Sequence, residues 1–315
     1  MSGFTITAGV SFSGGFTFTE APSENTAAWF GGGQYNPPGT RSTVQRITFA
    51  TDTATASVRG PLSGGIFGLA AASNTTYGWF GGGYDTGQVK STVGRITFAT
   101  DTDTASVRGP LSLARLWLAA AGNTTDGWFG GGYPGPLSTV DRITYATDTA
   151  TASVRGPLGS ARYGLVAAGN TTDGWFGAGR IPAPVSTVDR ITYATDTATA
   201  SVRGPLSFAR FALAAAGNTT DSWYTGAHAG GAGSTTVDRI TYATDTATAS
   251  VRGPLSAARF YIAAAGNSTD GWFGGGYGGF STVQRITYAT DTATASVRGP
   301  LSGSWGLMAA AGGMQ

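Results

Sequence analysis

The stretch Ser138-Thr-Val-Asp-Arg-Ile-Thr-Tyr-Ala-Thr-Asp-Thr-Ala-Thr-Ala-Ser-Val-Arg-Gly-Pro-Leu158 recurs six times in this sequence with few changes. The arginines of its closing Arg-Gly-Pro-Leu are Arg59, Arg108, Arg155, Arg203, Arg252 and Arg298, 46 to 49 residues apart. A second marker, an aromatic pair that begins with Trp, keeps the same interval. Its members are Trp29-Phe30, Trp79-Phe80, Trp128-Phe129, Trp175-Phe176, Trp223-Tyr224 and Trp272-Phe273. A period near 50 indicates one supersecondary unit copied six times, with each copy burying its faces against its neighbours.

Each copy contains four short segments typical of β-strands. In the third copy they are 116–121, 128–133, 140–147 and a segment that begins at 152, and turn-forming residues separate them. Thr, Val, Ile and Tyr are enriched in these segments, and no helical periodicity is present. Four antiparallel strands in about 50 residues form one blade of a β-propeller. The Ala-Ala-Ala at 119–121 suits the innermost strand, because strands crowd together near the axis. Val140 on one face of the third segment, and Ile143 and Tyr145 on the other, suit a blade stacked between two others.

The two ends of the repeat array complement each other. The first copy begins at residue 26 and lacks a Leu-Ala-Ala-Ala segment, whereas Trp305-Gly-Leu-Met-Ala-Ala-Ala311 follows the last Arg-Gly-Pro-Leu. We therefore predict that residues 305–311 complete the first blade and close the ring, which removes two exposed sheet edges. The predicted fold is an all-β, six-bladed propeller of four-stranded blades over residues 26–315.

Residues 1–25 precede the repeats and predict a separate β-hairpin arm and linker. Apolar side chains alternate there with Thr, Ser and Gly on both sides of Gly14-Gly15, which favours a hairpin with one apolar face. The residues of that face are Phe4, Ile6, Val10, Phe12, Phe16 and Phe18. Such an arm would either add strands to, or bury its aromatic face in, a partner subunit, or fold back on its own propeller.

The composition argues against several classes of function. Charged residues make up 11% of the chain and the net charge is +2, so we expect no basic patch for nucleic acid. The chain has no Cys and a single histidine, His228, which excludes a His/Cys metal cluster. No motif marks catalytic partners for His228. We expect no enzymatic activity, no metal and no cofactor. We also expect no membrane insertion and no secretion signal, because no apolar run approaches about 18 residues and the N-terminus lacks a basic and apolar leader.

The six copies differ mainly in two places. One is the loop after each Trp-Phe-Gly-Gly motif, and the other is the aromatic-rich segment after Arg-Gly-Pro-Leu. In a four-stranded blade both connections open on the same face, and loops on a rigid scaffold commonly bind ligands. The candidate binding residues are Tyr35, Tyr84, Tyr133, Tyr277, Trp117, Arg180 and His228. Drift in unconstrained loops explains the variation equally well, and Leu116 and Phe211 are better explained as channel-mouth or inter-blade core.

Polar residues that recur in most copies are interpreted as structural. The pairs Asp141-Arg142, Asp189-Arg190 and Asp238-Arg239 could be imagined as a ring of ligands. Adjacent strand residues point to opposite faces, so each is expected to pair with a neighbouring blade instead. The Asn-Thr-Thr and Asn-Ser-Thr runs match the glycosylation sequon, but a turn that begins with Asn explains them better. The Asp of each Thr-Asp-Thr turn is expected to make local hydrogen bonds.

The order Arg162-x-x-Leu-Val-Ala-Ala, Gly174-Trp-Phe-Gly-Ala-Gly179, Ile191-Thr-Tyr193 resembles the kelch repeat. The resemblance covers residues 26 to about 313 and implies a propeller. One departure is the fourth strand, which carries Thr-Ala-Thr-Ala where kelch blades usually have a Trp.

The string Ala-Thr-Asp-Thr-Ala-Thr-Ala-Ser-Val-Arg-Gly-Pro-Leu-Ser also resembles repeats in uncharacterised structural proteins of tailed phages, especially marine ones. This resemblance implies a non-enzymatic virion protein, a capsid decoration or a tail or fibre component. Such a protein is made in the host cytoplasm, docks on other virion proteins through its arm and presents the propeller outward. The alternatives are a receptor- or glycan-binding module, in which the candidate tyrosines and Trp117 stack on sugar rings, and an intracellular kelch adaptor.

Overall fold

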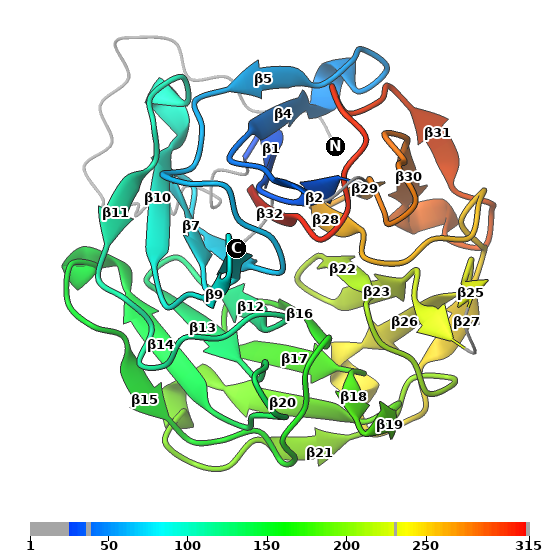
Figure 1. Ribbon diagram of the computed structural model, residues 1–315. Helices are drawn as coiled ribbons and strands as arrows, with labels where there is room; N and C mark the ends of the chain where they lie inside the picture. Colours follow the sequence, from blue (N-terminus) through cyan, green and yellow to red (C-terminus); the bar gives the residue numbers. More distant parts are fainter. Residues whose placement is uncertain (1–24, 36–38, 230–231, 313–315) are drawn as a thin grey trace, which may run out of the picture.

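The computed structural model describes residues 25–35, 39–229 and 232–312 of the 315-residue chain. These residues form six four-stranded antiparallel sheets that follow one another around a central axis (Figure 1). The predicted all-β, six-bladed propeller is therefore confirmed. The arm predicted for residues 1–25, with Phe4, Ile6, Val10, Phe12, Phe16 and Phe18, lies outside the described residues except for Asn25, and it stays a prediction.

Each blade is ordered from the axis outward, and blades are numbered here by their second strand in chain order. The innermost strands of blades 1 to 6 are β32 (Ala309–Gly312), β6 (Ala70–Ser73), β12 (Ala119–Gly122), β16 (Val166–Gly169), β22 (Ala214–Gly217) and β28 (Ala263–Gly266). The second strands are β1 (Ala27–Gly31), β7 (Tyr77–Gly81), β13 (Asp126–Gly130), β17 (Asp173–Gly177), β23 (Asp221–Thr225) and β29 (Asp270–Gly274). The third strands are β4 (Val44–Thr48), β10 (Val93–Thr97), β14 (Val140–Thr144), β20 (Val188–Thr192), β26 (Val237–Thr241) and β30 (Val283–Thr287). The outermost strands are β5 (Ser57–Arg59), β11 (Ser106–Arg108), β15 (Ser153–Arg155), β21 (Ser201–Arg203), β27 (Ser250–Arg252) and β31 (Ser296–Arg298).

Two kinds of short element complete the blades. A 3-10 turn follows every third strand, and the six turns are η1 (Phe49–Thr51), η2 (Phe98–Thr100), η3 (Tyr145–Thr147), η4 (Tyr193–Thr195), η5 (Tyr242–Thr244) and η6 (Tyr288–Thr290). Four of the loops between the second and third strands contain a two-stranded hairpin. These hairpins are β2 (Gln34–Tyr35) with β3 (Gly39–Thr40), β8 (Tyr84–Asp85) with β9 (Gln88–Val89), β18 (Arg180–Ile181) with β19 (Ala183–Pro184), and β24 (His228–Ala229) with β25 (Ala232–Gly233).

The C-terminal strand closes the ring, as predicted. β32 pairs antiparallel with β1 in the register Trp29 to Ala311 and Gly31 to Ala309. In Figure 1 the red end of the chain lies beside the blue start, in the same blade. The closing strand is Ala309–Gly312, so the predicted segment 305–311 contains both its lead-in and most of the strand.

Strand boundaries in the third copy differ from the prediction. The innermost strand begins at Ala119, because Trp117 has a positive φ of 55° that an extended strand cannot contain. The second strand spans Asp126–Gly130 and ends before Gly131 and Gly132, whose φ values are also positive. The third strand ends at Thr144, because Tyr145 enters the 3-10 turn η3.

Every blade is joined to the next by one tryptophan. The indole Nε1–H of Trp128 in blade 3 donates to Asp196 Oδ2 of blade 4 at 2.8 Å, and its ring stacks on Tyr193 with centroids 3.8 Å apart. Arg142 Nη1 donates to the same carboxylate oxygen at 3.1 Å. The other five Trp–Asp pairs, with N–O distances of 2.8 to 2.9 Å, are Trp29–Asp101, Trp79–Asp148, Trp175–Asp245, Trp223–Asp291 and Trp272–Asp52.

These pairs correct the expectation that the turn aspartates bond locally. The side chain of Asp148 is buried at 6% exposure and accepts hydrogen bonds from Trp79 and Arg95 of the preceding blade. The backbone reinforces this joint, since Gly109 N–H donates to Asp148 C=O. A Cβ at Gly109 would lie 1.9 Å from the carbonyl oxygen of Ala150, so the Gly of Arg-Gly-Pro is required by close contact between blades.

The core is divided among the blade interfaces. Ile143 and Tyr145 of blade 3 pack with Trp79 and Ala70 of blade 2, whereas Val140 packs with Phe176 of blade 4. The two faces of the third strand therefore serve two different interfaces, as its apolar pattern predicted.

Buried tyrosines under the tryptophans predict sensitivity to alkali. Burial raises the pKa of the hydroxyls of Tyr145, Tyr193, Tyr242 and Tyr288 above the ordinary value of 10.0. The folded state therefore holds these protons more tightly than the unfolded state. The contribution of these four tyrosines to the free energy of unfolding is fully present below about pH 10 and is lost as the pH rises beyond it. Replacing all four tyrosines by Phe should move the alkaline unfolding midpoint, followed by tryptophan fluorescence, to higher pH.

Two features of the chain indicate that this substitution changes little besides the hydroxyl groups. Phe49 and Phe98 already occupy the equivalent positions of blades 1 and 2, stacked on Trp272 and Trp29. In the described part of the chain, the hydroxyls of Tyr145 and Tyr288 have no hydrogen-bond partner, so their removal should cost little at pH 7. Tyr133→Phe, at a side chain that is 40% exposed, controls for loss of a hydroxyl as such. An unchanged alkaline midpoint in the fourfold variant would contradict the prediction.

Candidate functional site

The two variable segments of each blade pair with each other on one face of the propeller. Isolated β-bridges join Phe67 to Tyr84, Leu116 to Tyr133, Tyr163 to Arg180, Phe211 to His228 and Gln34 to Gly306. In blade 6 the N–H of Tyr277 donates to the carbonyl of Phe260 at 3.0 Å. We call the surface formed by these blade-to-blade connections and strand 2–3 loops the variable face.

Six residues of the connections form a closed ring of backbone hydrogen bonds. The N–H of Trp117 donates to the carbonyl of Gly68 at 2.7 Å, and each further member bonds to its predecessor in the same way. The members, one directly before each innermost segment, are Gly68, Trp117, Gly164, Ala212, Tyr261 and Leu307. The N–H of Gly68 closes the ring by donating to Leu307. We call this set the mouth ring, because all six members line one cavity of about 70 Å³ on the axis.

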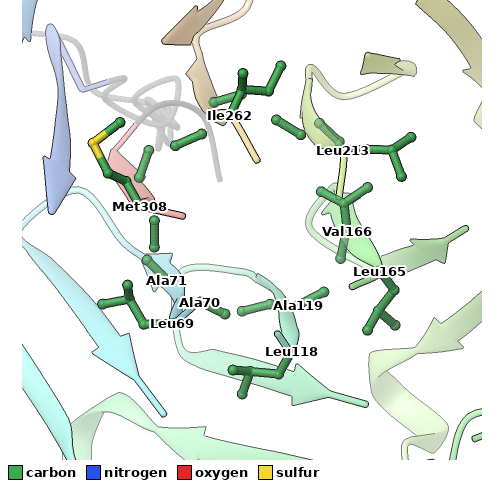
Figure 2. Close-up of a pocket in the computed structure, with 18 residues that line it drawn as sticks. Leu69, Ala70, Ala71, Leu118, Ala119, Leu165, Val166, Leu213, Ile262 and Met308 are labelled. Atoms are coloured by element: carbon green, nitrogen blue, oxygen red, sulfur yellow. The ribbon is translucent and has the colours of Figure 1, made fainter. Parts of the chain in front are cut away.

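Below the mouth ring a narrow channel follows the axis. Its next section, of about 110 Å³, is lined by Leu, Ile, Met, Val and Ala from the six innermost strands and the residues that lead into them, as Figure 2 shows. A further section of about 100 Å³ is lined mainly by Ala and Gly. The Ala-Ala-Ala runs thus line the axis, which is the place that the sequence pattern predicted for them.

All members of the mouth ring share a left-handed backbone conformation. Their φ values lie between 53° and 67°, a region that glycine adopts freely and other residues adopt at a cost of about 1 to 3 kcal/mol. Gly68 and Gly164 therefore fit their positions, and they also leave room for the rings of Trp117 and Phe211, which a Cβ would approach to 3.1 and 3.3 Å. Trp117 and Tyr261 place large rings where the backbone favours glycine. They belong to blades 3 and 6, which are opposite each other in a ring of six.

Aromatic side chains gather around both of these residues. In blades 3 and 4, the rings of Trp117, Tyr133 and Tyr163 lie within 5.4 to 5.7 Å of one another. The second and larger cluster, in blades 5 and 6, has neighbouring centroids 5.0 to 6.4 Å apart. Its members are Phe211, His228, Phe260, Tyr261 and Tyr277.

Polar groups accompany the aromatic rings. The guanidinium of Arg180 lies over the Phe211 ring at 5.4 Å. Burial raises the pKa of the Tyr261 hydroxyl, while the nearby charge of Arg180 acts in the opposite direction. The indole N–H of Trp117 is buried and has no acceptor among the described residues. Tyr133 and Tyr277 are 40% and 51% exposed, so the clusters can be reached from outside.

The structure places the predicted site residues at two related positions. Tyr84, Tyr133, Arg180, His228 and Tyr277 begin the strand 2–3 loops of five successive blades, each beside the connection that enters its blade. Trp117 lies one step inward, in the mouth ring. The backbone of Tyr35 belongs to β2, next to Gln34, which holds the equivalent position in blade 1.

Tyr163, Phe260 and Tyr261 belong to the clusters but were not among the predicted site residues. An alignment of the copies on the residue directly before Leu or Ile of the innermost segment would have placed Tyr261 with Trp117. Leu116 and Phe211, which were assigned to the core, are buried at 5% and 7% exposure.

The opposite face is uniform and its polar groups are engaged. The side-chain carbonyl of Asn123 accepts hydrogen bonds from the backbone N–H groups of Thr125 and Asp126, which is the turn predicted for the Asn-Thr-Thr runs. Its amide group also reaches the carbonyl of Thr171 in the next blade at 3.4 Å.

The recurring Asp-Arg pairs also have structural partners. Asp141 bonds Arg115 of the connection that enters its own blade, and Arg142 bonds Asp196 of the next blade. The two side chains point to opposite faces, as expected. The neighbouring-blade partner is correct for Arg142, whereas Asp141 turns to the connection.

His228, the single histidine of the sequence, lies in the aromatic cluster of blades 5 and 6. The ring neighbours of His228 are Phe211 and Phe260. The part of the chain that the structure describes has no group of three or more His, Asp or Glu residues placed to hold a metal ion. It also has no helix long and apolar enough to cross a membrane. No protein-family model matches the sequence, and a search of the curated proteins finds no match.

The strain in the mouth ring gives a prediction about stability. Replacing Trp117 and Tyr261 together by Gly removes two large side chains but relieves two left-handed residues. We expect these effects to offset each other to within about 1 kcal/mol in the free energy of unfolding, measured with a chemical denaturant. Leu118→Ala, at a side chain with 5% exposure, is the control and should cost about 2 to 5 kcal/mol. A loss in the Gly variant as large as that of Leu118→Ala would contradict the account of strain.

Proposed function

We propose that this chain is a binding module without catalytic activity, and that its ligand lies on the variable face over the mouth ring. The observation that carries the proposal is the placement of Trp117 and Tyr261 in backbone positions that favour glycine. Residues held in costly conformations concentrate at functional sites, where the surrounding structure maintains them. Gly68 and Gly164 show that the ring itself does not require a side chain.

The contrast between the two faces supports the same proposal. The Trp–Asp joints and the Asn turns hardly change between copies, whereas side chains around the mouth ring range from Gly to Trp. A rigid scaffold with one divergent, aromatic-rich face is the usual arrangement of a binding surface.

The chemistry of the clusters favours a carbohydrate ligand. Exposed rings such as Tyr133 and Tyr277 offer flat apolar surfaces, and the guanidinium of Arg180 offers hydrogen-bond donors on the same face. A sugar ring presents an apolar face edged with hydroxyls, so it can use both. The near-neutral charge of the chain favours neutral over strongly acidic glycans.

As part of the same proposal we place the module in the particle of a tailed phage, as a capsid decoration or a tail or fibre component. The support is the resemblance of the recurring Ala-Thr-Asp-Thr-Ala-Thr-Ala-Ser-Val-Arg-Gly-Pro-Leu-Ser string to repeats of phage structural proteins. The arm of residues 1–25 would dock on another virion protein, which leaves the variable face directed outward.

Binding is tested on an array of defined neutral and acidic oligosaccharides. We expect saturable binding of neutral glycans by the full chain, with affinity at least tenfold lower after Tyr133→Ala or Tyr277→Ala, because truncating an aromatic anchor of a binding surface commonly costs about 2 kcal/mol or more. Val154→Thr, on the 60% exposed side chain of an outermost strand, is the matched control. Binding that survives both tyrosine changes, or no binding to any glycan, would refute the carbohydrate ligand.

The location is tested separately on purified phage particles by electron microscopy with a gold-labelled antibody against the propeller. We expect label on the head, tail or fibres of every particle. Preparations in which the propeller antibody labels no particle would refute the virion placement and leave the binding proposal standing.

A further inference from the structure

In several blades, the connection that enters the blade covers a space beside the second and third strands, which we call the slot. In blade 3 the slot is filled by the side chain of Arg115, which is fully buried. Its guanidinium donates to the carbonyls of Phe129 and Thr139 and to the carboxylate of Asp141, each at 2.9 Å. Three acceptors, on the second strand, on the third strand and directly before the third strand, thus define a guanidinium site inside the blade.

Blades 4 and 5 repeat this arrangement. Arg162 donates to the carbonyl of Phe176 at 2.9 Å and pairs with Asp189 at 2.9 Å. Arg210 donates to the carbonyls of Tyr224 and Thr236 and pairs with Asp238 at 2.8 Å. All of these arginines and aspartates have side chains with 0% exposure.

Blade 2 replaces both members of the pair. Ile66 stands at the position of the arginine and Gly94 at that of the aspartate. The slot is a cavity of about 190 Å³, and its lining includes Phe80, Thr92 and Gly94, which correspond to Phe129, Thr139 and Asp141. The residues that hold a guanidinium in three other blades therefore surround an open cavity in this one.

The connection over the cavity is held by the same backbone hydrogen bonds as the connection of blade 3. The backbone N–H groups of Leu62 and Ile66 donate to Ser42 and Arg41 at 2.7 and 3.0 Å. The equivalent bonds in blade 3, from Leu111 to Ser91 and from Arg115 to Lys90, measure 2.8 and 3.0 Å. The connection is in the same place in both blades, so the cavity arises from the smaller side chains and not from a displaced backbone.

The charges at the rim of the cavity balance each other, because Asp85 and Lys90 both line it and pair at 3.1 Å. A guanidinium that enters the cavity therefore competes with Lys90 for the carboxylate of Asp85. Blade 6 shows that this framework holds a guanidinium without a buried carboxylate. There Arg259 is 4% exposed, donates to the carbonyl of Gly275 at 3.0 Å and lies over the Phe280 ring, while Gln284 occupies the aspartate position.

We propose that the blade 2 cavity binds a guanidinium group, carried by an arginine side chain of a partner protein. The side chain enters beneath the connection at 62–66, its guanidinium lies against Phe80 and Thr92, and it takes the place of Lys90 as the partner of Asp85. This site is independent of the aromatic clusters and of their proposed carbohydrate ligand.

The test is an NMR titration of the full chain with N-acetyl-arginine N-methylamide, followed at the backbone amides of Ser63 and Gly94. We expect saturable shifts at these amides, and at least tenfold weaker binding of the matched lysine compound, which cannot contact two carbonyls with a planar group. Methylguanidinium serves as the fragment without a side chain. Equal binding of the lysine compound would overturn the assignment of the cavity to a guanidinium group. Binding of methylguanidinium without binding of the arginine compound would overturn the proposal that an arginine side chain carries this group.

Two variants taken from the chain's own repeats sharpen the test. Gly94→Asp restores the carboxylate of blade 3 and should tighten binding of the arginine compound at least tenfold. A Cβ at Gly94 would meet only Ala105, at 3.6 Å, so the change fits. Adding Ile66→Arg fills the slot with the native pair and should abolish binding. Unchanged affinity in Gly94→Asp, or binding that persists in the double variant, would overturn the proposal; the first result holds even if the double variant does not fold.

Discussion

The bond from a tryptophan of one blade to an aspartate of the next is the interaction on which this propeller depends. The carboxylate of Asp196 accepts hydrogen bonds from the buried indole N–H of Trp128 and from the partly exposed guanidinium of Arg142. A buried carboxylate is costly unless several donors satisfy it, and here the charged donor and the indole both come from the preceding blade. The blades therefore satisfy one another's buried groups. The pair Trp272–Asp52 applies the same rule where the last blade meets the first.

This constraint explains the distribution of change along the chain. Trp, Asp, Arg and the Gly of Arg-Gly-Pro recur because each contacts a neighbouring blade, as the 1.9 Å approach at Gly109 illustrates. The mouth ring is held by backbone hydrogen bonds, which leave its side chains free to vary from Gly68 to Trp117. In these connections the backbone atoms therefore stabilise the fold, and the side chains are left for the proposed binding. In blade 2 that freedom extends to Ile66 and Gly94, where the framework stays in place without its buried ion pair.

Much of the fold could be predicted from the sequence, because a repeat displays its periodicity openly. The blade count, the strand order and the closure by the last segment followed from the spacing of Arg-Gly-Pro-Leu and from the Ala-Ala-Ala run at the end. Contacts between copies could not be predicted in this way, because the spacing of residues within one copy does not identify partners about 70 residues away in the next copy. Asp148 was assigned to a local turn for that reason. The left-handed conformation of Trp117 and Tyr261 was also missed, although Gly68 and Gly164 at the same position of other copies indicate a site that favours glycine. The arm and the ligand of the variable face stay predictions.

The most direct measurement on this account is a double-mutant cycle at one joint, with Trp128→Phe and Asp196→Ala measured singly and together by denaturant unfolding. Phe retains the ring that stacks on Tyr193, so the cycle isolates the bond between the indole and the carboxylate. We expect both single changes to destabilise the chain and the pair to be coupled by about 1 to 3 kcal/mol, since either change alone removes the bond and leaves a buried group without its partner. Additive effects, with no coupling between the two positions, would contradict the claim that this bond joins the blades.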